Sequence, residues 1–173
     1  MERLLAGGAD VQGESRNGSS ALLGAVVHGD VEIVQMLLTA SADPSAKNAH
    51  GYTPLHGAVQ AGHTDIVQLL LDKDVDVNVK TKEGQSLLFA TAKGETGAGL
   101  QLMLDRKGSD VQGGGETPLL FAAEGGSGTI VQLLVDKGAD VNLTDRCGES
   151  PILRAADAGH RAIVQLYILN PKP

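Results

Sequence analysis

Residues 51–71 read GYTPLHGAVQAGHTDIVQLLL, and this stretch decides the fold. Thr53 offers an N-cap hydroxyl, and Pro54 takes the first helical position, where no amide donor is lost. Gly62 supplies the left-handed turn that ends this first helix. The helix that follows carries Ile66, Val67, Leu69 and Leu70. Because these apolar residues are spaced three and four apart, they share one buried face. The stretch therefore predicts two short helices joined by a tight turn.

This pattern repeats along the chain. Glycines open successive segments at Gly18, Gly51, Gly84, Gly115 and Gly148, with separations of 33, 33, 31 and 33 residues. Aspartates close the segments at Asp10, Asp43, Asp76, Asp110 and Asp140. Self-similarity at such a period is typical of solenoid proteins, in which each unit packs on its neighbours. We interpret the recurring aspartates as architecture rather than as an acid–base pair.

The residues Tyr52-Thr53-Pro54-Leu55-His56, followed by Gly62-His63 and Ile66–Leu71, closely resemble the ankyrin repeat. The same motif returns as Thr117-Pro118-Leu119 and Ile130–Leu134. The resemblance covers nearly the whole chain, from about Leu4 to about Leu169. It implies an all-α ankyrin-repeat solenoid of stacked helix-turn-helix units. It also implies β-hairpin loops that project at roughly a right angle and a concave binding face.

The register divides a single ankyrin-repeat domain, residues 1–173, into a partial repeat and five repeats. Their expected boundaries are 1–12, 13–45, 46–78, 79–112, 113–142 and 143–173. The third repeat departs most from the pattern, with one extra residue near Arg106 and with Gly94, Gly97 and Gly99 around its second helix. Glycine in a helix interior costs about 1 kcal/mol relative to alanine. We expect this repeat to be the least stable layer and a candidate position for a bend.

Both ends of the sequence resemble interior repeats rather than polar caps, which solenoids normally carry. This favours an excerpt of a longer protein over a chain whose ends meet a partner. End-to-end self-association through the uncapped terminal repeats stays an option.

Charge and cysteine content bound the class of protein. The formal net charge is −7, and the basic residues form no cluster of the kind that binds nucleic acid. The single Cys147 cannot form an internal disulfide, which favours a reducing compartment. No apolar run resembles a signal peptide or approaches the length that spans a bilayer. We expect a cytoplasmic or nuclear protein that inserts in no membrane.

Reactive groups do not converge in this sequence, so we expect no enzyme, no cofactor and no metal site. The family resemblance implies that His56 ties neighbouring repeats together through backbone hydrogen bonds, and that His63 and His160 are structural too. His28 and His50 lack metal-ligand spacing. Cys147 is expected at an exposed hairpin tip, as an incidental thiol.

The resemblance implies that partner contacts lie at the hairpin tips and on the exposed side of each first helix. Carried over by register, the expected partner-binding residues are Arg16, Asn17, Ser19, His28, His50, Tyr52, Gln60, Lys82, Glu83, Gln85, Glu116, Glu124, Arg146, Glu149 and Asp157.

Within this set, Arg16, His50 and Tyr52 are expected to lie close together as an anchor, because Tyr and Arg dominate binding hot spots. The acidic residues toward the C-terminal end favour a partner with basic groups there.

The leading hypothesis is a protein–protein interaction module that binds another protein. Two alternatives stay open: a structural spacer in a longer ankyrin array without a specific partner here, and an unusual enzymatic or small-ligand site grafted on the scaffold.

Overall fold

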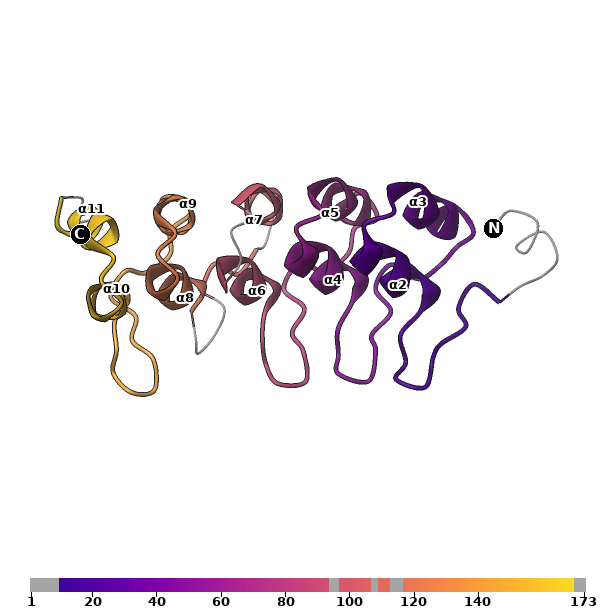
Figure 1. Ribbon diagram of the computed structural model, residues 1–173, viewed down its shortest axis with the longest axis horizontal. Helices are drawn as coiled ribbons and strands as arrows, with labels where there is room; N and C mark the ends of the chain where they lie inside the picture. The colour runs from indigo at the N-terminus through magenta and orange to yellow at the C-terminus, as the bar shows by residue number, and fades with distance from the viewer. Residues whose placement is uncertain (1–9, 94–96, 107–108, 113–116, 170–173) are drawn as a thin grey trace. The chain divides into compact units, whose positions relative to one another are not determined.

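The computed structural model describes residues 10–93, 97–106, 109–112 and 117–169, and the side chains of 91–93 are not among the described parts. The chain falls into two compact units, residues 1–87 (unit 1) and 88–173 (unit 2). Each predicted repeat contains two helices among the described residues, which confirms the all-α solenoid class (Figure 1). The repeat boundaries and their grouping into one domain stay predictions.

Unit 1 contains two helix pairs, α2 (Ala21–His28) with α3 (Val31–Thr39), and α4 (Pro54–Ala61) with α5 (Thr64–Leu71). The first helices α2 and α4 pack on each other, and so do the second helices α3 and α5. These pairs form two helical layers, from which hairpin loops project on the side of the first helices (Figure 1).

Unit 2 continues the same scheme with three pairs. Helix α6 (Leu87–Lys93) begins at the unit boundary and is followed by α7 (Gly97–Leu104). The remaining pairs are α8 (Pro118–Glu124) with α9 (Gly128–Asp136), and α10 (Pro151–Asp157) with α11 (Arg161–Leu169). Helix α8 packs on α10, and α9 packs on α7 and α11.

Local side chains start the first helices as the sequence predicts. The side-chain oxygens of Ser20, Thr53, Thr117 and Ser150 each accept the backbone N–H three residues further on. Such a bond satisfies a donor that has no partner inside the helix. The recurring aspartates are also architectural, because the carboxylates of Asp10, Asp43, Asp76, Asp110 and Asp140 each accept the N–H two residues on.

The second helix of the second repeat buries a slightly different stripe from the predicted one. Ile66, Val67 and Leu70 are buried as expected, but Leu69 is only half-buried and Leu71 takes the fourth buried place. Because successive helical residues are about 100° apart, Leu71 lies beside Val67 and faces the core. The described part of the core contains aliphatic side chains almost throughout, so the core of each repeat is similar to that of the next.

The resemblance implies that His56 forms the hydrogen bonds between repeats, but in the described part of the structure His63 and His160 form such bonds and His56 does not. The His56 Nδ1 pairs with the Thr53 hydroxyl of its own repeat at 2.9 Å. Its Nε2 has no hydrogen-bond partner among the residues that the structure describes. His63 and His160 instead reach the carbonyl oxygens of Val27 and Glu124 in the preceding repeat, at 3.4 and 2.8 Å.

The hairpin loops are held by turns more than by strands. Isolated antiparallel bridges join Glu14 to Ser20 and Lys80 to Ser86, and no longer ladder occurs in the described segments. We call residues 13–20, 46–53 and 79–86 fingers 1, 2 and 3. Turn hydrogen bonds such as Gly51 N–H to the Asn48 carbonyl oxygen, at 2.9 Å, close each tip.

A glycine pair tests how tightly the first helices pack. Gly24 and Gly57 hold the same position in α2 and α4. A Cβ at Gly24 would meet nothing within 4 Å, whereas a Cβ at Gly57 would lie 3.1 Å from Leu23 Cδ1 and 3.2 Å from Val27 Cγ2. We expect Gly24→Ala to raise the free energy of unfolding by about 0.5–1 kcal/mol, because alanine loses less entropy in a helix.

The same change at Gly57 should give no gain, because the new methyl group displaces two packed side chains. Urea denaturation followed by circular dichroism measures both. Equal gains for Gly24→Ala and Gly57→Ala would contradict the close packing of α4 on α2. The lower stability expected of the third repeat stays a prediction.

Candidate functional site

The tips of the three fingers in unit 1 are joined by backbone hydrogen bonds. The Ala49 N–H donates to the Asn17 carbonyl oxygen, and the Lys82 N–H donates to the His50 carbonyl oxygen, both at 3.0 Å. These bonds link finger 1 to finger 2 and finger 2 to finger 3. Because main-chain groups make the links, the side chains at the tips remain available for other contacts.

Two glycines allow this close approach. A Cβ on Gly18 would lie 3.2 Å from the Ala49 nitrogen, and one on Gly51 would lie 3.0 Å from the Lys82 nitrogen. Both glycines have positive φ, at +72° and +77°, where a side chain would also be strained. The regular spacing of these glycines in the sequence therefore reflects the hydrogen bonds that join each fingertip to the next.

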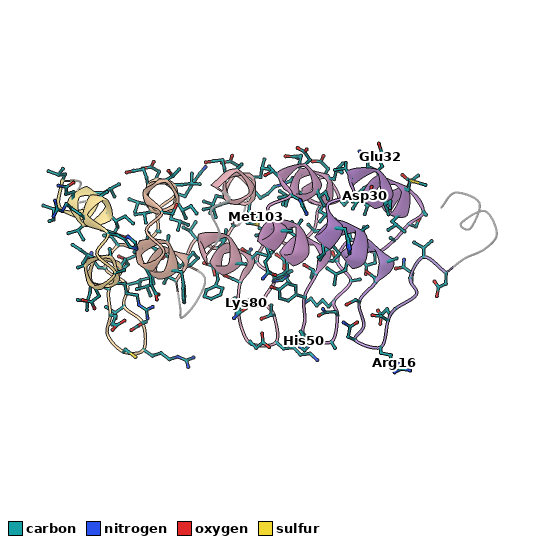
Figure 2. The ribbon with its side chains drawn as sticks, viewed as in Figure 1. Arg16, Asp30, Glu32, His50, Lys80 and Met103 are labelled. Atoms are coloured by element: carbon teal, nitrogen blue, oxygen red, sulfur yellow. The ribbon has the colours of Figure 1, made fainter. Side chains whose placement is uncertain are left out.

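The expected anchor of Arg16, His50 and Tyr52 is spread along the fingers. Arg16 and His50 are exposed at the tips of adjacent fingers (Figure 2). Tyr52 is half-buried against α4, where its hydroxyl donates to Gln60 Oε1 at 2.8 Å and its ring centroid lies 4.9 Å from that of His56. Burial, with a smaller effect of the Glu83 charge, raises the pKa of the Tyr52 hydroxyl.

Several expected site residues of unit 1 therefore fall into two groups. Arg16, Asn17, His50, Lys82 and Glu83 occupy the exposed tips. The others lie nearer the first helices, at Ser19, His28, Tyr52, Gln60 and Gln85. His28 ends α2, and its Nδ1 lies 3.0 Å from the Gly24 carbonyl oxygen.

Unit 2 contains a shallow hollow beside α8 and α10, the first helices of its last two repeats. It has a volume of about 260 Å³ and is lined by Glu124, Glu149, Arg154, Asp157 and Ala158. Three of these are expected site residues, which the fold brings together from α8, α10 and the hairpin between them. Arg146 is exposed at the tip of that hairpin beside the exposed Cys147. Glu116 lies outside the described residues.

Arg154 organises the charges of this hollow. Its guanidinium lies 2.6 Å from Glu124 Oε2, 2.6 Å from Asp145 Oδ2 and 3.1 Å from Glu149 Oε2. The hydrogen bond to Asp145 contributes most to raising the pKa of Arg154 above its ordinary value. The pKa of Asp145 is lowered, first by the backbone N–H of Glu149 and then by Arg154. Three carboxylates pair with this one cation, and a fourth, Asp157, also lines the hollow.

Arg154 and Phe121 were not predicted as site residues. The guanidinium carbon of Arg154 lies 5.8 Å from the Phe121 ring centroid, and Phe121 packs edge-to-face on Phe89 at 4.3 Å. Arg154 and Phe121 both hold the position of Gly57, which faces the preceding repeat. The change from glycine to a large side chain at one repeat position is the signal that could have identified them.

The described residues contain no group of three or more His, Cys, Asp or Glu side chains placed to hold a metal ion. Among the described helices, none has both the length and the apolar character needed to cross a membrane.

A family model described as ankyrin repeats (three copies) matches this chain over two ranges, residues 1–81 and residues 87–171. No curated protein matches the sequence. The matched ranges include nearly every residue and all the helix pairs described above, and residues 82–86 of finger 3 lie between the two ranges. The chain belongs to the ankyrin-repeat family.

Proposed function

We propose that this chain is a protein–protein interaction module that binds another protein through its fingers and first helices and has no catalysis of its own. One observation carries the proposal. Main-chain hydrogen bonds hold the tips of fingers 1 to 3 together, while Arg16, His50 and Lys82 extend exposed side chains. Binding residues concentrate on loops that a rigid scaffold positions, because loops tolerate variation that the packed helices do not.

The hollow of unit 2 supports a second contact surface. Glu124, Glu149 and Asp157 line it, and with Asp145 they outnumber the single cation Arg154 by four to one. Complementary charge speeds the encounter of two proteins and selects among partners. This surface favours a basic side chain of the partner, as the acidic residues of the sequence also indicate.

Site-specific photo-crosslinking tests the proposal. A benzophenone side chain replaces His50 or Lys82 at the tips in one set of proteins. In a matched set it replaces Glu32 or Asp65, which are exposed on the second helices. After exposure to cell extract, the tip positions should capture a discrete partner that the second-helix positions do not.

The variant Arg16→Ala/His50→Ala/Lys82→Ala, added as a competitor, should reduce the crosslink less than the unmodified chain does. Circular dichroism should show that the variant and the unmodified chain have the same helix content. Crosslinks of equal strength from both sets, or none from either, would contradict the proposal. The absence of crosslinks from both sets would favour the role of a structural spacer instead.

A further inference from the structure

Charge is divided between the two ends of unit 1. Within residues 10–87, the three fingers carry four basic side chains, Arg16, Lys47, Lys80 and Lys82, against two acidic ones, Glu14 and Glu83. The rest of this range carries one basic side chain, Lys73, against eight acidic ones, and all eight are exposed. The fingers therefore have a net charge of +2, while the remainder has −7.

The separation is visible in the arrangement of labelled side chains. Arg16 and His50 lie at the finger tips, and Lys80 lies on a limb of finger 3 (Figure 2). Asp30 and Glu32 lie at the opposite end of the unit, at the start of α3. Unit 1 thus has a basic end made of fingers and an acidic end made of the second helices and their turns.

Three of the four basic side chains of the fingers are available for binding. All four are exposed, and Arg16, Lys47 and Lys82 form no ion pair with any carboxylate that the structure describes. Two of these residues, Arg16 and Lys82, hold equivalent positions in fingers 1 and 3. The tip hydrogen bonds from Ala49 and Lys82 keep the three fingers side by side, so Arg16, Lys47 and Lys82 contribute one basic group from each of three adjacent fingers.

We propose that the basic finger row, defined as Arg16, Lys47 and Lys82 with one residue from each finger, binds an acidic segment of a partner protein, rich in Asp or Glu. The inference rests on the proposed function and names the chemistry of the partner at the fingers. Because main-chain hydrogen bonds hold the three fingers together, an extended acidic chain meets them without a rearrangement of their backbone. The acidic end of the same unit repels that chain, so the field orients it toward the fingers.

Nuclear magnetic resonance of the ¹⁵N-labelled full chain tests this inference. The probes are a short glutamate-rich peptide, its lysine-rich and glutamine-rich counterparts, and a short single strand of DNA. Only the glutamate-rich peptide should shift amide signals strongly, and the shifts should gather at the fingers. The affinity should fall steeply as salt rises, because exposed charges are screened within about 10 Å at 0.1 M ionic strength.

Two lysine variants separate local from overall charge. Lys82→Glu and Lys73→Glu change the net charge of the protein equally, but only Lys82 belongs to the finger row. We expect Lys82→Glu to weaken peptide binding about threefold and Lys73→Glu to change it less than about twofold. The variant Arg16→Glu/Lys47→Glu/Lys82→Glu should weaken binding by more than about tenfold.

Equal losses in Lys82→Glu and Lys73→Glu, shifts away from the fingers, or no shift at millimolar peptide would overturn the inference. Tighter binding of DNA than of the peptide at the fingers would overturn it too, since the partner would then be a nucleic acid. If photo-crosslinking at the tips captures a partner while the glutamate peptide fails, the interaction role stands and only the acidic partner is wrong.

Discussion

Lowering the pH from about 7 to about 4 is expected to reduce the free energy of unfolding by about 3 kcal/mol through His56 alone. His56 is 1% exposed and is buried in the first turn of α4. Burial, helped by the charge of Lys47, lowers the pKa of His56 from 6.5 to about 4. The imidazole therefore stays neutral in the folded protein over a range of pH in which the unfolded chain becomes protonated.

The sign follows from proton binding. Between pH 6.5 and about 4, the unfolded state holds a proton on His56 that the folded state lacks, so acid favours unfolding. The stability is fully present above pH 6.5 and is lost progressively as the pH falls toward 4. Urea denaturation at a series of pH values, followed by circular dichroism, measures the slope.

His56→Leu is the control, because leucine holds the same position at Leu23, Leu120 and Leu153. Near pH 7 the variant should differ from the natural chain by no more than about 1 kcal/mol, the size of a lost hydrogen bond to Thr53. Near pH 4.5 the variant should be the more stable protein. The rest of the sequence is identical in the two proteins, so the difference between the two curves isolates His56. Parallel curves would contradict the expectation.

The second large effect concerns the turn between α8 and α9. We expect Gly126→Ala to lower the free energy of unfolding by about 3 kcal/mol. Gly126 has a φ of +80°, and a Cβ there would lie 2.5 Å from the His160 ring. The substitution combines backbone strain with displacement of the ring whose Nε2 pairs with the Glu124 carbonyl oxygen at 2.8 Å.

Gly159→Ala is the matched control. Gly159 holds the same turn position one repeat later, with a φ of +77°, but a Cβ there would meet nothing within 4 Å. This variant should lose only about 1 kcal/mol, from backbone strain. Thermal and urea denaturation compare the two. Adding His160→Ala to Gly126→Ala should recover part of the loss, since the alanine leaves room for the new methyl group. Equal losses at Gly126 and Gly159 would mean that the histidine contact contributes nothing.

Sequence alone predicted the helix pairs because their signals are local. The Thr53 hydroxyl caps a backbone N–H only three residues away, and the Asp76 carboxylate caps one two residues away. Such contacts need no information about neighbouring repeats. The period of the glycines then placed fingers 1 to 3, and the exposed positions of Arg16, His50 and Lys82 followed from the register.

The tertiary structure decided which side chains meet across repeats. Tyr52 turns away from the tips because its hydroxyl donates a hydrogen bond to Gln60 Oε1 on α4 and because its ring is partly buried there. Arg154 gathers Glu124 from the preceding repeat and Asp145 from its own hairpin, over separations of 30 and 9 residues.

The sequence by itself therefore determined the family, the helix pairs and the positions of the tips, because capping and helical periodicity act over a few residues. Only the tertiary structure decided the partners of Tyr52, His56 and Arg154, as well as the hydrogen bonds that join the fingers. Those contacts depend on the distance between stacked layers, which one period of the repeat does not encode.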